Sequence, residues 1–423
     1  MTKKSDAPAI RFKGFSDAWE QRKVLSCIQK ITDFRGRTPK KLGMDWSESG
    51  YLALSALNVK DGYIDFSQDV HYGDQALYDK WMSGNELHKG QVLFTTEAPM
   101  GNVAQVPDNR QYILSQRTIA FDVREDIITE NFLATLLRSP AVFNTLTSLS
   151  SGGTAKGVSQ KSLAGVEVRI PVDLREQALL ATYFHNLDNL ITLHQRKFEK
   201  LTNVKKSMLE KMFPQNGCSY PEIRFKGFTD AWEQRKLGDM MNVTSVKRIH
   251  QSDWTDSGVR FLRARDIVAA AKNEEPDDYL YISKEKYEEY SALSGKVGVS
   301  DLLVTGVGTI GVPYLVRNLE PLYFKDGNII WFQNSDKIDG KFLFYSFSAE
   351  QIQGFINESA GIGTVGTYTI ESGKKTPISL PNQIEQAKVG EFFQQLDNLI
   401  TLHQRELEKL QNIKKSMLEK MFV

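Results

Sequence analysis

"LDNLITLHQRKFEKLTNVKKSMLEKMF", residues 187–213, returns at residues 396–422 as "LDNLITLHQRELEKLQNIKKSMLEKMF". Apolar residues recur in both copies at three- and four-residue steps, which predicts one long amphipathic helix in each. Neither copy contains Gly or Pro, and Pro214 follows the first. A stripe this long must be buried, and its own duplicate is the simplest partner. The sequence therefore predicts two long helices packed as an antiparallel coiled coil.

Two interpretations of these helices remain open. They could dimerise the protein or only fill a core, or they could form a rigid spacer between two binding domains. A helix from about Phe184 to Phe213 would be roughly 45 Å long at 1.5 Å per residue, which is near thirteen base pairs of DNA at 3.4 Å each. The residues predicted for helix packing or partner docking are Leu187, Leu190, Ile191, His194, Leu201, Met208, Leu396, Leu399, Ile400, His403, Leu410 and Met417.

A second duplication shows that the whole chain is written twice. "IRFKGFSDAWEQRK" at residues 10–23 returns as "IRFKGFTDAWEQRK" at residues 223–236. We expect an α+β protein: two strand-rich, mixed α/β domains joined by two long antiparallel helices, as a pseudo-twofold tandem duplication. The expected parts are a leading segment 1–23, domain 1 at 24–178, spacer helix 1 at 179–214, a repeated leading segment 215–236, domain 2 at 237–387 and spacer helix 2 at 388–423.

The two middle domains share their spacing but not their surface residues. "GQVLFTTEAPMGNV" from Gly90 matches "SDLLVTGVGTIGVP" from Ser300, and "SSGGTAKGVSQ" from Ser150 matches "AGIGTVGTYTI" from Ala360. Runs such as "YILSQRTIAFDV" from Tyr112 are rich in β-branched and aromatic residues and predict strands. The pattern indicates a common scaffold that holds two different readers.

Composition limits the class of protein. The net charge of +1 over 423 residues gives no bulk basic excess, although clustering on one face matters more than the sum. The only cysteines, Cys27 and Cys218, indicate neither a disulfide framework nor a thiolate metal site. No apolar run approaches the roughly 20 residues that span a bilayer, and the first residues lack the apolar core of a signal peptide. We expect a soluble, cytoplasmic protein.

Polar and basic stretches recur in both domains. Gly-rich and Ser/Thr loops beside Arg, Lys and Gln suit phosphate contact and base-edge readout, although a single basic residue is more often a solvated surface charge. The candidates for DNA contact on these grounds are Arg35, Arg37, Lys40, Thr95, Thr96, Arg117, Lys156, Lys161, Lys247, Arg248, Arg263, Lys374 and Lys375.

No catalytic or metal-binding constellation emerges. "GVGTIG", residues 306–311, fits a dinucleotide-binding pattern, but a strand-like "VPYLV" follows it where a helix is required, so we predict a hairpin loop. The histidines show no metal-ligand spacing. We therefore predict a role that is neither catalytic nor metal-dependent.

The duplicated segments, the "G-x-V-L-F-T-T…G" and "G-G-T-x-K-G-V" stretches, and "EQ…LDNLITLHQR…EKL…KKSMLEKMF" after each domain resemble the specificity subunit of type I restriction-modification enzymes over essentially the whole chain. The resemblance implies two target-recognition domains that each read half of a bipartite, gapped double-stranded DNA site. It implies helices that set the gap and dock two methyltransferase subunits for N6-adenine methylation, with motor–nuclease subunits for restriction and no membrane. It also implies no cofactor in this chain, with S-adenosylmethionine, ATP and Mg²⁺ in the partner subunits.

The resemblance adds Thr305 and Thr309 to the loops expected to face DNA. Gly366 stands opposite Lys156 in the second copy, which puts a shared phosphate contact there in doubt. Another hypothesis remains: a non-enzymatic two-domain scaffold that binds protein or carbohydrate and oligomerises through its helices.

Overall fold

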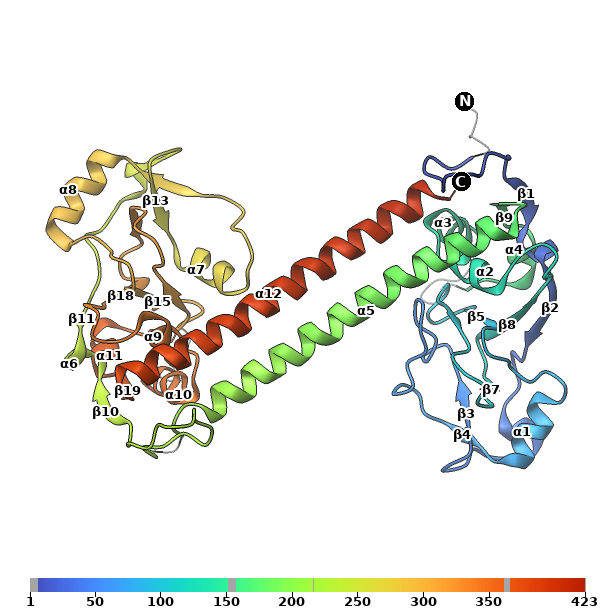
Figure 1. The fold of residues 1–423 in the computed structure, drawn as a ribbon, viewed down its shortest axis with the longest axis horizontal. Coiled ribbons are helices and arrows are strands. Elements are labelled where there is room, and N and C mark those ends of the chain that lie inside the picture. The colour runs from blue at the N-terminus through green and yellow to red at the C-terminus, as the bar shows by residue number, and fades with distance from the viewer. Residues whose placement is uncertain (1–6, 151–156, 216, 361–365, 423) are drawn as a thin grey trace. The chain divides into compact units, whose positions relative to one another are not determined.

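The computed structural model describes residues 7–150, 157–215, 217–360 and 366–422. The chain divides into two compact units: unit 1 comprises residues 1–194 with 406–423, and unit 2 comprises residues 195–405. Each unit therefore contains one mixed α/β domain and parts of both long helices. These helices are α5 (Leu174–Lys211) and α12 (Gln383–Lys420), which Figure 1 labels.

Both long helices confirm the predicted duplication, and both start earlier than the duplicated phrase suggests. Each has 38 residues and begins five residues before the segment predicted for it. The stretches before the duplicated phrase, "EQALLATYFHN" and "EQAKVGEFFQQ", belong to the same continuous helices. Asn382 caps α12, because its side-chain oxygen accepts a hydrogen bond from the backbone N–H of Glu385 at 3.0 Å.

Unit 1 contains nine strands and four shorter α-helices among its described residues. Its elements are β1 (Glu20–Lys23), β2 (Ile28–Asp33), β3 (Tyr51–Leu54), β4 (Tyr72–Gly73), α1 (Gln75–Met82), β5 (Val92–Thr95), β6 (Val103–Gln105), β7 (Ile113–Leu114), β8 (Thr118–Val123), α2 (Glu130–Leu137), α3 (Pro140–Leu149), α4 (Gln160–Ala164) and β9 (Glu167–Ile170), with 3₁₀ turns η1 (Val24–Cys27) and η2 (Pro39–Leu42). The sheets have the orders β2-β8-β5-β6, β4-β3-β7 and β1-β9.

Unit 2 repeats this plan with changes in its helices. Its elements are β10 (Glu233–Lys236), α6 (Leu237–Met240), β11 (Asn242–Thr244), η3 (Gln251–Asp253), β12 (Trp254–Thr255), β13 (Val259–Leu262), α7 (Ala264–Ala271), β14 (Leu280–Ile282), α8 (Lys284–Ser294), β15 (Leu302–Thr305), β16 (Pro313–Leu315), β17 (Leu322–Phe324), β18 (Ile329–Gln333), α9 (Gly340–Ser346), α10 (Glu350–Ser359), α11 (Ile370–Lys375) and β19 (Pro377–Leu380). The sheets have the orders β11-β18-β15-β16, β12-β14-β13-β17 and β10-β19.

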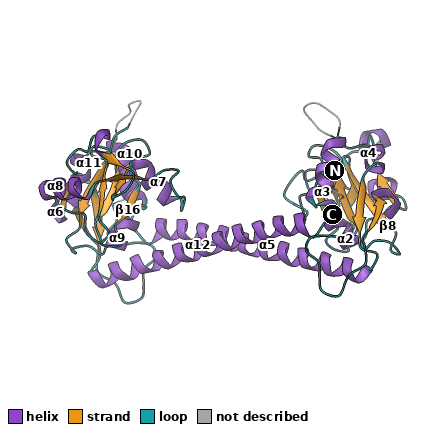
Figure 2. Cartoon of the chain, turned by 90° about the horizontal axis from the view of Figure 1, so that it is seen from above, coloured by secondary structure: helices purple, strands orange, loops and turns teal. Residues whose placement is uncertain are grey.

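The central strand of each domain lies between two cores. All four residues of β5 are buried, because successive side chains of a strand point to opposite faces. Val92 and Phe94 enter the core beside α2 and the long helices, whereas Leu93 enters a second core around Trp81. Strand β15 does the same in unit 2. Figure 2 shows helices flanking the strands of each unit.

The starts and ends of the long helices pack against each other within each unit, as antiparallel pairing predicts. In unit 1, Leu187 of α5 is buried in the core that Leu410, Ile413 and Met417 of α12 contact. In unit 2, Leu396 of α12 joins the core that Leu201, Val204 and Met208 of α5 contact. The same positions of the duplicated phrase therefore meet at both places.

Of two other predictions, the hairpin loop is confirmed and the single long strand is wrong. The "GVGTIG" stretch is a hairpin loop as predicted, since β15 pairs antiparallel with β16. The run "YILSQRTIAFDV" is not one strand: it forms β7 and β8, which belong to different sheets. The break falls at Arg117, whose φ of 64° is incompatible with a continuous strand. Within the described residues, no helix is long and apolar enough to span a membrane.

Candidate nucleic-acid interface

Each leading segment is fixed to the first turn of a long helix by a buried ion pair. Arg11 donates two hydrogen bonds of 2.7 Å to Glu176, whose side chain is only 1% exposed. Arg224 donates bonds of 2.6 and 2.7 Å to Glu385, which is fully buried. A bidentate guanidinium–carboxylate pair fixes both distance and orientation. The two leading segments are therefore attached to the two long helices through the same Arg–Glu contact.

Three loops meet at one junction in unit 1. The backbone N–H of Thr96, after β5, donates to the carbonyl of Arg117 at 2.8 Å, and the N–H of Val158 donates to the carbonyl of Thr96 at 2.8 Å. Glu97 and Gly157 form an isolated antiparallel bridge beside these bonds. The loops that follow β5, β7 and α3 are thus joined by backbone hydrogen bonds.

The same junction is built in unit 2. The N–H of Gly306 donates to the carbonyl of Asn328 at 2.8 Å, and the N–H of Tyr368 donates to the carbonyl of Gly306 at 2.9 Å. Val307 and Thr367 form the matching bridge. Asn328 therefore occupies the place of Arg117, and Val307 occupies the place of Glu97.

The basic segment "FRGRTPKK", residues 34–41, lies against this junction. The side chain of Gln116 donates a hydrogen bond to the carbonyl of Arg37, and Gln160 donates to Asp33 at 2.9 Å. Arg35 pairs with the same carboxylate at 2.6 Å. Burial works to raise the pKa of Asp33, but hydrogen bonds from Arg35 and Gln160 lower it below its usual value.

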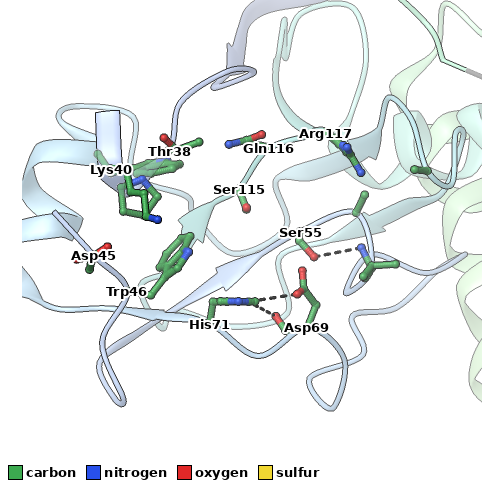
Figure 3. Close-up of a pocket in the computed structure, with 15 residues that line it drawn as sticks. Thr38, Lys40, Asp45, Trp46, Ser55, Asp69, His71, Ser115, Gln116 and Arg117 are labelled. Atoms are coloured by element: carbon green, nitrogen blue, oxygen red, sulfur yellow. Dashed lines mark hydrogen bonds and ion pairs between the residues drawn. The ribbon is translucent and has the colours of Figure 1, made fainter. Parts of the chain in front are cut away.

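A pocket of about 390 Å³ opens between this segment and the loops of domain 1. Figure 3 shows Thr38, Gln116 and Arg117 along one side and Trp46, His71 and Asp69 along the opposite side. Trp46 packs against Trp81 with 5.8 Å between ring centroids. The pocket therefore combines an aromatic wall with basic side chains, Lys40 and Arg117, and acidic ones, Asp45 and Asp69, and such donors and acceptors can meet base edges.

The threonines predicted to face DNA take different positions. Thr95 and Thr305 are fully buried and Thr96 is nearly so. The hydroxyl of Thr95 accepts a hydrogen bond from the N–H of Asn102 at 2.8 Å, and that of Thr305 accepts from Val312 at 2.9 Å. These three side chains shape the loops from inside rather than contacting a ligand. Thr309, by contrast, is exposed.

The basic candidates of domain 1 are mostly brought together. Arg35, Arg37, Lys40 and Arg117 gather around the junction and its pocket. Arg37 is half-buried, because its guanidinium packs over the ring of Phe34 at 4.3 Å. Lys161 is exposed on α4. Lys156 lies outside the described residues.

The basic candidates of domain 2 divide into two groups. Lys247 and Arg248 follow β11, and Arg248 pairs with Asp326 of the junction loop at 3.6 Å. Arg263 is instead engaged by Asp266 and Asp278, both at 2.9 Å, which fits a structural role. Lys374 pairs with Glu371 of its own short helix at 2.8 Å. Lys375 is exposed on that helix.

The helix candidates also divide. Leu187 and Leu396 are buried, and Ile191, His194, Leu201, Met208, Ile400, His403, Leu410 and Met417 are half-buried. Leu190 and Leu399 stay 43% and 44% exposed. They therefore leave an apolar strip on equivalent positions of the two helices.

Sequence reasoning missed Glu97, Gln116 and Trp46. A third duplication could have found Trp46, since "DWSESG" from Asp45 returns as "DWTDSG" from Asp253. Glu97 stands in the stretch that matches residues 300–313, but Val307 is opposite it there, and Gln116 stands in a stretch that carries no repeat signal. Among the described residues, no cluster of His, Cys, Asp and Glu could hold a metal ion.

Comparison with known protein families identifies the family of this duplicated chain. The family described as "Type I restriction modification DNA specificity domain" matches residues 28–203 and again residues 229–412. The chain belongs to this family. It is a specificity subunit of a type I restriction-modification system, which recognises DNA and assembles with other subunits while catalysis lies elsewhere.

Known relatives extend over nearly the whole specificity subunit. It is 26% identical over 416 residues to the type I restriction enzyme MjaVIII specificity subunit of Methanocaldococcus jannaschii, covering 95% of this chain and 91% of the relative. A putative MjaX specificity subunit of the same organism is 23% identical over 428 residues, covering 95% and 92%. The crystal structure of a type I S subunit from M. genitalium shares the fold, with a TM-score of 0.63, 14% identity and 99% of both chains covered.

Proposed function

We propose that each domain of this specificity subunit reads one half of a bipartite, gapped DNA site in the cytoplasm. The two long helices set the gap and dock two methyltransferase subunits, which methylate N6 of adenine. A motor–nuclease subunit joins the complex for restriction. S-adenosylmethionine, ATP and Mg²⁺ belong to those partners.

One observation carries this proposal: the same loop junction is built twice with different side chains at its open positions. Ser115, Gln116 and Arg117 connect β7 to β8 in unit 1, whereas residues 325–328, "KDGN", make the equivalent connection in unit 2. The junction bonds are the same, but the connection differs in length and in polar groups, which is what two readers of different sequences require. The buried Arg–Glu contacts of the two leading segments are the same in both units. The units therefore differ in the loops that we propose to read DNA.

The exposed apolar positions of the helices support partner docking. Leu190 and Leu193 of α5 and their equivalents, Leu399 and Leu402 of α12, are all exposed. Residues three positions apart are neighbours on a helix surface, and exposed apolar side chains that lie next to each other mark an interaction surface. Two equivalent strips fit two copies of one partner.

The gap is tested by lengthening both helices at equivalent positions, four residues after Arg196 and four after Arg405. Four residues add about 6 Å of helix, or one to two base pairs at 3.4 Å each. The variant and its methyltransferase partner are expressed in cells that lack other methylation, and the methylome is determined by long-read sequencing. We expect the same two half-sites with a gap longer by one or two base pairs.

Two results would contradict the proposal. Changed half-sites with an unchanged gap would remove the spacer role from the helices. A wild-type complex without any gapped motif, whose DNA binding is also insensitive to salt, would favour the protein- or carbohydrate-binding scaffold, because phosphate contact releases counterions and makes binding steeply salt-dependent.

A further inference from the structure

We propose that Arg117 and Glu97 act as one unit that reads a G·C base pair in the half-site of domain 1. The inference rests on the DNA-reading function proposed above. It assigns a specificity-determining role to one ion pair at the loop junction.

The pair is exposed and already formed in the protein alone. Arg117 Nε lies 3.0 Å from Glu97 Oε1, and the two side chains are 56% and 44% exposed. An ion pair this open to water contributes little to stability. Its geometry is therefore available for a ligand rather than needed by the fold.

The backbone holds both residues firmly. The carbonyl of Arg117 accepts hydrogen bonds from both the N–H and the hydroxyl of Thr96, at 2.8 and 3.2 Å. Glu97, the next residue, is bridged to Gly157. A loop tied at both positions pre-organises the side chains it presents, which reduces the entropy lost on binding.

The backbone of Arg117 has a conformation that is unfavourable for arginine. Its φ of 64° lies in the left-handed region, which residues with a Cβ rarely adopt. Glycine would relieve this strain, whereas Asn328, at the equivalent position of unit 2, has no positive φ. Strained residues of this kind gather at functional sites. An arginine at this strained position therefore points to a functional role for its side chain.

The chemistry of the pair selects one base pair. A guanidinium donates to O6 and N7 of guanine in the major groove, and a carboxylate accepts from the N4 amino group of cytosine. Arg117 and Glu97 therefore match the two edges of G·C together. Because each already balances the charge of the other, the carboxylate does not approach the phosphates as an isolated negative charge.

Unit 2 carries different chemistry at the same two positions. Asn328 replaces Arg117 and Val307 replaces Glu97, as the junction hydrogen bonds establish. An amide pairs with N6 and N7 of adenine, and an apolar side chain contacts the methyl group of thymine. The exchange of a charged pair for Asn and Val therefore corresponds to an exchange of G·C for A·T.

The test transfers the second pair into the first domain. The double variant Glu97→Val with Arg117→Asn is expressed in the full chain with the methyltransferase partner, and the methylome is compared with wild type. We expect one position of one half-site to change from G·C to A·T, with a loss of about 5- to 150-fold on the original site. The other half-site and the gap stay unchanged.

A second variant and a control guard against misfolding. Arg117→Gly removes the guanidinium and relieves the backbone, so the discrimination at that position should weaken, with only Glu97 left to contact the base pair. Arg110→Asn removes a similarly exposed arginine, which pairs with Asp108 at 2.9 Å in the same domain, and should leave the motif intact. Thermal melts establish that all three variants fold.

Uniformly weaker binding to every sequence, with a salt dependence reduced by about one counterion, would make Arg117 a phosphate contact and overturn the inference. An altered base in the other half-site would overturn it as well. Failure of the proposed function looks different, because the wild-type complex would then give no gapped motif at all.

Discussion

Asp188 of α5 and Lys414 of α12 form an ion pair of 2.7 Å, and Asp397 and Lys205 repeat it at 2.6 Å. The first pair lies within unit 1 and the second within unit 2. Each aspartate stands near the start of the duplicated phrase and each lysine near its end. One phrase thus carries both partners of the contact, and only an antiparallel arrangement of two copies can join them.

Stability of unit 1 should depend on the charge of Asp188. Burial works to raise the pKa of this carboxyl, but Arg138 and Lys414 together lower it below its usual value. Because the pKa is lower in the folded state, the ionised carboxylate stabilises the fold at pH values above the unfolded pKa of about 3.9. This contribution to stability is lost as the pH falls through the folded pKa. Asp188→Asn should cost roughly 2 kcal/mol at pH 7.

Thermal melts of wild type and Asp188→Asn between pH 7 and pH 2.5 would measure this. The difference in Tm should be constant down to about pH 5 and shrink below pH 4. Asp126→Asn serves as the control, because its pair with Arg124 is exposed. A Tm difference that stays constant to pH 2.5 would contradict the assignment.

Removal of Arg224 should destabilise unit 2 strongly. Glu385 is fully buried, so Arg224→Ala leaves its carboxylate without compensation. We expect a loss of about 3–5 kcal/mol in denaturant unfolding, partly recovered when Glu385→Gln is added. Arg175→Ala removes an exposed arginine and should stay within about 0.5 kcal/mol of wild type. Equal effects of the two arginine variants would contradict a structural clamp.

Leu190 and Leu399 should matter for assembly more than for folding. Both are exposed, so Leu190→Ser with Leu399→Ser should change Tm little while weakening methyltransferase binding by roughly tenfold or more. Calorimetric titration of the partner would measure this. Leu187→Ser is the matched comparison, since that side chain is buried and its loss should lower Tm. Unchanged affinity of the double variant would place the docking surface elsewhere.

The third duplication contains a glycine that no other residue can replace. Gly258 has a φ of 133°, and an added Cβ would lie 2.3 Å from the carbonyl oxygen of Ile282. Gly258→Ala should therefore cost about 2 kcal/mol or more. Gly354→Ala, in α10 with open space around it, should instead stabilise by about 0.5–1 kcal/mol. Urea unfolding of both variants compares them, and a stable Gly258→Ala protein would refute the steric argument.

The long helices could be predicted because their information is local and periodic. An apolar stripe without Gly or Pro predicts an amphipathic helix, and its near-identical second copy predicts the packing partner. Their true starts were harder to find, because residues 174–186 are helical but differ between the copies in all but a few positions. The conserved phrase marks where the helices touch each other rather than where they begin.

The surface roles of single residues could not be predicted in the same way. Thr95 and Thr309 look alike in the sequence, yet one is sealed in a hairpin and the other is exposed. Arg263 finds its partner fifteen residues away in Asp278, and no local pattern encodes that contact. Glu97 gains its importance only because the fold brings Arg117 beside it.

The hydrogen bond from Ile10 to the carbonyl of Lys420 has its equivalent in the bond from Ile223 to Lys211, both close to 3 Å. In the second case a short connecting peptide joins the two partners, and in the first case none does. Trp19 meets Phe422 much as Trp232 meets Phe213, at 6.2 and 6.0 Å. Docking of a leading segment on a helix end therefore does not depend on backbone continuity, so a chain nicked by a protease between residues 217 and 222 should keep the second leading segment docked within unit 2.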